Sequence, residues 1–141
     1  MQTFLPYADF AQSAQCLDVK RLGKQRVEAM QMINAIEGVP TKSGKVYRGW
    51  HNHPCTRMWR PYVSALKLYT NVVITEWINR GYRNSIPFYV IDVDVVYPHW
   101  LGNDLFHRSH QSNLYHKLPT YYPQFDMEWI PYVWNDEFIE K

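Results

Sequence analysis

The chain has 141 residues, of which 46% are hydrophobic, 20% are charged and 16% are aromatic. This length supports one hydrophobic core rather than two, and this composition excludes an intrinsically disordered chain. No basic leader precedes an apolar run, and no apolar stretch approaches the roughly 18 residues of a membrane span. We therefore expect a cytoplasmic protein with no membrane association, in which Cys16 and Cys55 are reduced thiols.

Charge is distributed unevenly along the chain. Residues 1–60 contain nine Lys and Arg against four Asp and Glu, which gives a net charge of +5, whereas residues 61–141 carry −3. A polyanion should therefore bind along the first half. The many aromatic residues fit either rings at the surface that stack on bases or a tyrosine-rich core.

The pattern of apolar residues predicts a mainly α, compact single domain over residues 1–141. Asp9 is placed to cap a short helix that ends near Leu17, and Asp18 to cap a longer helix that ends near Glu37, before Gly38. On the second helix, five apolar residues recur at helical spacing and predict its buried stripe: Val19, Leu22, Met30, Ile33 and Ile36. Gly23 costs helix stability unless something approaches closely there.

Residues 41–52 are polar, basic and contain glycine, which predicts a loop. Pro54 suits the first position of a long helix that reaches about Arg80, is kinked or split at Pro61 and stops at Gly81. Its predicted core face is Val63, Leu66, Val73 and Trp77.

The last third of the chain changes character. Apolar residues alternate with aspartates over 86–98, which predicts a strand or a paired extended segment near 88–96. A final helix should run from Asn103 or Asp104 to Lys117, and three prolines after it predict a succession of short turns.

A polar strip on the second helix is the strongest local signal for function. Asp18, Arg21, Gln25 and Glu28 are spaced three, four and three residues apart and share one helix face. Such a strip is commonly a solvated face with ordinary salt bridges. Alternatively, Arg21 and Arg26 clamp phosphates while Glu28 stabilises the cationic, oxocarbenium-like transition state of glycosidic cleavage.

Three stretches of the sequence carry a family resemblance. Residues 22–28 (LGKQRVE) resemble an early L-x-x-x-x-R-E type signature, with Val27 between the arginine and the glutamate. Residues 53–84 are similar to a histidine-led long helix that ends in an R-G-aromatic turn, and residues 107–125 to a last helix with an aromatic segment after it. In this order, the three stretches resemble the pyrimidine-dimer DNA glycosylase/AP-lyase family of the phage endonuclease V type.

The resemblance implies an enzyme that kinks double-stranded DNA and flips a nucleotide out of the stack. The N-terminal amine then attacks C1′, and the resulting imine permits β-elimination of the strand. An α-amine suits this role because its pKa near 8 leaves a neutral fraction at pH 7. The implied substrate is damaged or modified DNA, bound by a monomer without cofactor or metal. The expected catalytic residues are Glu28, Met1, Gln2 and Arg26.

The residues expected to contact DNA combine the helix strip with a basic loop and the later histidines. They are Arg21, Lys24, Gln25, Lys42, Lys45, Arg48, His53, Arg57, His107, Arg108 and His110. His107 and His110 are spaced three apart on a helix, so a metal site shared with Asp104 is a less common alternative for them.

One departure from the family pattern leaves the nucleophile open. The family has a small residue 2 that is uncovered when the initiator methionine is removed, whereas residue 2 here is Gln. The amine would then belong to Met1, or water would attack with help from Glu28. A non-catalytic DNA-binding protein on the same fold and a phage or bacterial enzyme acting on modified bases are the alternative functions.

Overall fold

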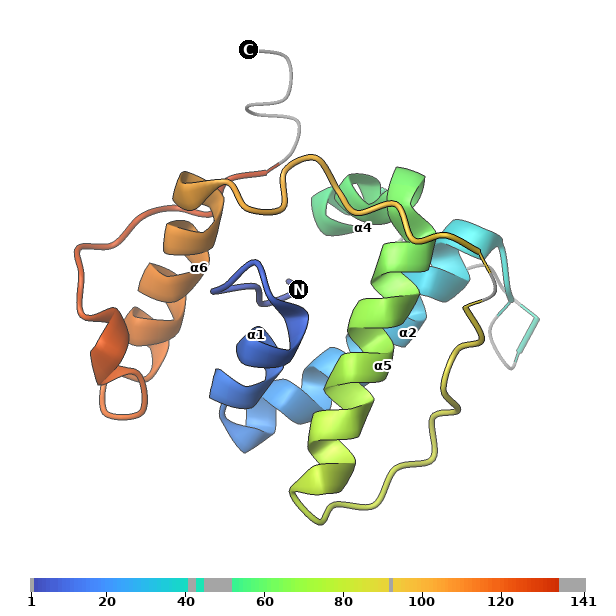
Figure 1. Ribbon diagram of the computed structural model, residues 1–141, viewed down its shortest axis with the longest axis horizontal. Helices are drawn as coiled ribbons and strands as arrows, with labels where there is room; N and C mark the ends of the chain where they lie inside the picture. Colours follow the sequence, from blue (N-terminus) through green and yellow to red (C-terminus); the bar gives the residue numbers. More distant parts are fainter. Residues whose placement is uncertain (1, 41–42, 45–51, 92, 135–141) are drawn as a thin grey trace.

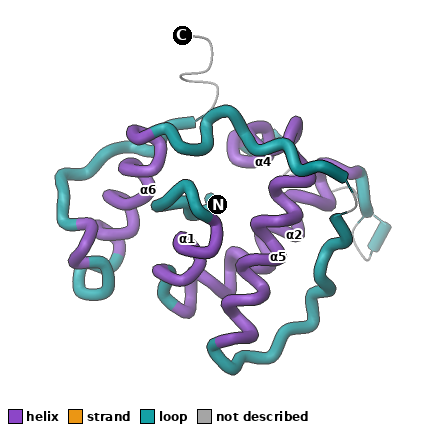
Figure 2. The backbone as a smooth tube through the Cα atoms, in the orientation of Figure 1, coloured by secondary structure: helices purple, strands orange, loops and turns teal. Residues whose placement is uncertain are grey.

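The structure is a computed structural model, and it describes residues 2–40, 43–44, 52–91 and 93–134. In chain order, the α-helices are α1 (Phe10–Cys16), α2 (Val19–Glu37), α4 (Pro54–Trp59), α5 (Val63–Asn79) and α6 (Asp104–Lys117). Two short 3₁₀ turns, Arg60–Tyr62 and Pro123–Phe125, complete the regular structure, and no strand occurs in the described ranges (Figures 1 and 2). The predicted mainly α fold is confirmed.

The helices begin and end where the sequence signals place them. The side chains of Asp9, Asp18 and Asn103 each accept a hydrogen bond from the backbone N–H three residues further on. Gly38 follows α2 with φ of 72° and Gly81 follows α5 with φ of 91°, a left-handed conformation that costs glycine little. The predicted break at Pro61 is also confirmed, because a 3₁₀ turn separates α4 from α5.

The core forms where α2 and α1 pack against α5, with α4 lying across one end (Figure 1). The predicted stripe on α2 is only partly correct, because Val19 is 43% exposed while Gln25 and Ala29 are buried. On α5, the predicted Leu66 and Val73 are fully buried. The largest buried side chains of the core are Trp59, Trp100, Tyr69, Tyr122 and Phe106.

The segment over 86–98 forms no strand in its described part, 86–91 and 93–98. The side chain of Asn71 takes the place of a neighbouring strand, since its amide nitrogen donates to the Tyr89 carbonyl (2.9 Å) and its oxygen accepts from the Tyr89 N–H (2.8 Å). The strand alternative is therefore not realised there, and the alternating apolar residues stay largely exposed, as Val90 at 82% and Val93 at 61% show. Separately, no helix in the described part of the chain combines the length and apolar character that crossing a bilayer requires.

Candidate active site

The first residues of the chain run through the middle of the molecule rather than along its surface (Figure 1). Residues 2–6 are all buried, although they form no helix. From α2, the Gln25 amide oxygen accepts from the Phe4 N–H (2.9 Å) and its nitrogen donates to the Gln2 carbonyl (2.5 Å). From α5, the Tyr69 hydroxyl lies 2.6 Å from the same Gln25 oxygen and 3.2 Å from the Phe4 carbonyl.

Helix α6 holds the next residues of this segment. His107 Nδ1 donates to the Leu5 carbonyl (2.7 Å), and His110 Nδ1 accepts from the Leu5 N–H (2.9 Å). The Gln111 side chain donates to the Pro6 carbonyl (2.7 Å). Side chains from three helices thus satisfy a buried backbone that has no secondary structure of its own, which fixes the position of the chain's start.

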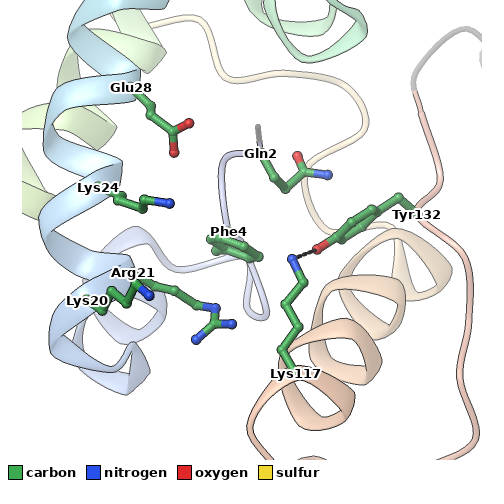
Figure 3. Close-up of a pocket in the computed structure, with 8 residues that line it drawn as sticks. All are labelled: Gln2, Phe4, Lys20, Arg21, Lys24, Glu28, Lys117 and Tyr132. Carbon is green, nitrogen blue, oxygen red and sulfur yellow. Dashed lines mark hydrogen bonds between the residues drawn. The ribbon is translucent and has the colours of Figure 1, made fainter.

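This arrangement places Gln2 and Phe4 on the wall of a pocket of about 280 Å³ (Figure 3). Four residues of α2 form one side of the pocket, Lys20, Arg21, Lys24 and Glu28, and Lys117 of α6 and Tyr132 lie across from them. The pocket therefore gathers four basic side chains around one carboxylate. Met1, which precedes Gln2, is outside the described residues.

The charged groups of the pocket influence one another. Burial raises the pKa of Glu28, and the positive charges of Lys24 and Lys117 only partly oppose this effect. Burial lowers the pKa of Lys117, and the nearby charges of Arg21 and Lys24 lower it further. The Lys117 ammonium lies over the rings of Phe4 (5.2 Å) and Tyr132 (5.7 Å).

Arg21 is held at the pocket by an ion pair with Asp18 (3.2 Å) at the start of the same helix. The Tyr122 hydroxyl also donates to the Asp18 carboxylate, and the backbone N–H of Asp18 donates to the same hydroxyl (2.8 Å). Burial opposes ionisation of Asp18, but the Tyr122 hydrogen bond and Arg21 outweigh it, so the Asp18 pKa is lowered. Asp18 is therefore ionised at neutral pH and fixes the direction of the Arg21 guanidinium.

The structure brings Gln2, Arg21, Lys24 and Glu28 together at this pocket, and their catalytic and DNA-contact roles stay predictions. Arg26 does not join them. Its Nη1 donates to the Asn84 side chain (2.8 Å) and its guanidinium lies 4.7 Å from the centre of the Trp77 ring. Two residues along a helix turn a side chain by about 200°, so Arg26 points toward α5 while Glu28 points into the pocket. The catalytic role of Arg26 stays a prediction, and the structure does not place this residue at the pocket.

Three predicted DNA contacts have buried side chains: Gln25 is 1%, His107 7% and His110 0% exposed. The structure shows them binding the chain's own N-terminal segment, and their contact with DNA stays a prediction. His107 uses both ring nitrogens, since Nε2 accepts from the Gly102 N–H (2.8 Å) while Nδ1 donates to Leu5. These engaged nitrogens also argue against the metal alternative with Asp104. Within the described ranges, no three His, Cys, Asp or Glu side chains are grouped to hold a metal.

The other predicted DNA contacts lie away from the pocket or outside the described residues. His53 caps α4 by accepting from the Cys55 N–H (3.1 Å), and Arg57 is exposed on the same helix. Arg108 is exposed on α6, with Asp104 3.9 Å away. Their roles stay predictions. Lys42, Lys45 and Arg48 fall outside the described part of the chain.

Sequence reasoning missed Lys20, Lys117 and Phe4. Lys20 had a usable signal, because Lys20, Lys24 and Glu28 are spaced four residues apart and share a helix face. Lys117 and Phe4 had none, because only the tertiary structure brings them to α2.

A sequence model of the pyrimidine dimer DNA glycosylase family matches residues 1–90. Comparisons with curated proteins and with solved structures gave no match. The matched residues include the buried chain start and the whole of α2, with Glu28 and the three basic residues that line the pocket beside it. Since the match covers more than half of the chain, the protein belongs to the pyrimidine dimer DNA glycosylase family.

Proposed function

We propose that this protein is a DNA glycosylase that releases a pyrimidine base from damaged or modified double-stranded DNA, using its N-terminal amine as the nucleophile. The observation that carries the proposal is the pocket in which Glu28 faces Gln2 and four basic side chains. Gln2 lines the pocket, and consecutive Cα atoms are about 3.8 Å apart. The amine of residue 1 therefore belongs to the residue bonded directly to the pocket wall.

The basic residues supply the means to bind DNA. Lys20, Arg21 and Lys24 follow one face of α2 and Lys117 faces them from α6, so phosphates on either side of a distorted nucleotide would each meet a positive charge (Figure 3). A nucleotide inside a duplex does not expose C1′ to such a pocket. Flipping the nucleotide or its partner out of the stack is therefore part of the proposal.

The proposed reaction uses the amine and Glu28 together. The neutral α-amine attacks C1′, the C1′–N bond of the base breaks, and the base leaves with the electron pair of that bond. The Glu28 carboxylate stabilises the positive charge that develops on the sugar and accepts a proton from the attacking nitrogen. The amine adduct opens to an imine, and loss of a proton from C2′ then expels the 3′ phosphate as a lyase step.

Borohydride trapping tests this proposal. Purified protein would be incubated with duplexes that carry a pyrimidine dimer, an abasic site or a modified pyrimidine, with and without borohydride. We expect base release and a covalent protein–DNA adduct, which peptide mass spectrometry assigns to the N-terminal amine. Glu28→Gln should reduce base release by at least about 100-fold, because the carboxylate is lost at the reacting carbon. Glu128→Gln, the same change at an exposed glutamate, should react like the unaltered protein.

The other outcomes separate the alternatives. Base release without an adduct would replace the amine with water as the nucleophile. If the unaltered protein releases no base from any duplex, and DNA binding is the same in it and in Glu28→Gln, the protein is a non-catalytic DNA-binding protein and the proposal is overturned.

A further inference from the structure

The side-chain amide of Gln2 has one atom that no described residue bonds. Gln2 is only 5% exposed, and its Oε1 accepts from the Thr3 N–H (3.1 Å) and from the Cys55 thiol (3.6 Å). Its Nε2 is buried and has no hydrogen-bond partner among the residues that the structure describes. In Figure 3 this nitrogen points across the pocket toward Tyr132. An unsatisfied buried donor is unfavourable, so an acceptor that reaches it stabilises the complex.

The surroundings of Gln2 prevent the amide from turning over. A flipped amide would place its NH₂ group against the Thr3 N–H, which is also a donor. The backbone of Gln2 is held as well, because Gln25 donates to its carbonyl. Gln25 is in turn fixed by the Phe4 N–H and the Tyr69 hydroxyl. The amide of Gln2, which lines the pocket, is therefore fixed so that its donor, and not its acceptor, is left for a further hydrogen bond.

We propose that Gln2 Nε2 donates to the O2 carbonyl of the departing pyrimidine and so helps to release the base, an inference that rests on the proposed function. If the amine of residue 1 reaches C1′, the side chain of residue 2 reaches the atoms around C1′. The carbonyl nearest to C1′ is O2, because C2 is bonded to the ring nitrogen that C1′ carries. The substrate class is accordingly a base with a carbonyl beside its glycosidic nitrogen, which pyrimidines have and adenine lacks.

The same contact would act in the transition state. When the C1′–N bond breaks, its electron pair moves to the base, where N1 and O2 share the negative charge; water then supplies the proton that neutralises the base. A donor fixed at O2 before the reaction stabilises this charge without reorganising. Lys117, whose ammonium lies beside Tyr132, adds positive charge on the same side of the pocket (Figure 3).

The test compares two reactions of the same protein variants under single-turnover conditions. The first is cleavage of the C1′–N bond in a duplex with a pyrimidine dimer, where the cut base stays joined to its neighbour until photoreversal of the dimer frees it for counting. The second is borohydride trapping at a preformed abasic site, which has no O2 atom. Gln2→Glu replaces the donor with an acceptor, and Gln2→Met removes it without adding charge. Gln124→Glu makes the same change at an exposed glutamine and serves as the matched control. Circular dichroism melts establish that each variant folds, and intact mass establishes that all start with the same residue.

We expect Gln2→Glu to slow base release by about 100-fold or more, the usual effect of losing one such donor. Gln2→Met should slow it by a smaller factor, and for both variants trapping at the abasic site should fall much less than base release. Equal losses in the two reactions would overturn the inference, since Gln2 would then only position the chain start. If the unaltered protein neither releases a base nor forms an adduct, the proposed function itself fails.

Discussion

Buried polar side chains hold the start of this chain through bonds that require one protonation state. His110 Nδ1 accepts from the Leu5 N–H, so the proton of the neutral ring is on Nε2. Burial, together with the charges of His107 and Lys117, lowers the pKa of His110 to about 3. The His107 pKa is lowered by burial as well. Both histidines are thus neutral when they bind the N-terminal segment.

Because the pKa values of both histidines are lowered, we predict that the free energy of unfolding falls in mild acid. The unfolded chain binds a proton at His110 near pH 6.5, whereas the folded protein binds one only near pH 3. Stability is therefore complete above pH 6.5 and falls as the pH drops toward 3, by about 1.4 kcal/mol per pH unit for one such histidine. Urea unfolding at pH 7.5, 6 and 5 measures this slope.

His110→Asn provides the control for that experiment, because the Asn oxygen can accept from the Leu5 N–H but does not titrate. This variant should be less stable at pH 7.5 and should lose less stability between pH 6.5 and 5. Equal slopes in the two proteins would show that His110 is not the responsible group.

The sequence predicted residues on α2 better than residues brought there by tertiary contacts. Glu28 and Arg21 share a helix face, so spacing alone grouped them. Gln25 lies at the edge of the same face. Spacing could not show that Gln2 and Phe4 of the N-terminal segment bind its side chain and cover it. Nor could spacing show that the Arg26 side chain turns to Asn84 and the Trp77 ring, because both partners lie far from it in the sequence.

At the scale of elements, the contact between α2 and α5 depends on a glycine. A Cβ atom on Gly23 would lie 2.9 Å from Cζ3 and 3.0 Å from Cη2 of Trp77. The Trp77 ring has little room to move, since it stacks on Tyr82 (4.5 Å between centres) and its Nε1 donates to the Arg83 carbonyl (2.8 Å). The Trp77 ring thus packs so closely against α2 that only glycine fits at position 23.

We predict that Gly23→Ala destabilises the protein although alanine favours helices. The helix gains about 1 kcal/mol in propensity, but overpacking typically costs about 1–3 kcal/mol, so a net loss of about 1 kcal/mol is expected. Chemical denaturation measures it. In the double variant Gly23→Ala/Trp77→Leu the clash is relieved, so the alanine should then be neutral or stabilising; an additive effect would contradict the packing explanation.

Caps and glycines made the helices predictable, because each signal acts within one turn of the backbone. The segment over 86–98 was harder, since alternation of apolar residues normally indicates a strand with one buried face. Here a side-chain amide of α5 satisfies the backbone instead, which removes the need for a partner strand. Nothing local in the sequence distinguishes these two ways of bonding the same residues.

At the scale of the whole molecule, the pocket lies where the charge of the sequence predicted an anion would bind. Three of its four basic residues belong to the positively charged first half of the chain. Lys117 comes from the negatively charged second half and is placed there by α6. Local fields at a pocket thus matter more to DNA binding than the net charge of +2.

Salt dependence of DNA binding should report these contacts. If all four basic residues contact phosphates, the slope of log K against log salt concentration should be about −3.6 or steeper. In Lys24→Ala this slope should be less steep by about 1. Lys67→Ala removes the same charge from a lysine that pairs with Glu37 (2.8 Å) and does not line the pocket. Fluorescence anisotropy over a salt series compares them. Equal changes in slope for both variants would contradict the assignment of Lys24 to a phosphate.

The burial of residues 2–6 also has a consequence for biosynthesis. The hydrogen bonds from His107 and His110 to Leu5 join residues more than 100 positions apart. A ribosome must therefore synthesise α6 before Leu5 can form these hydrogen bonds, and closing so long a loop slows folding. Truncated nascent chains that lack α6 can form local helices, yet they have no means of fixing Leu5. Part of the first segment to be synthesised is thus among the last to become ordered.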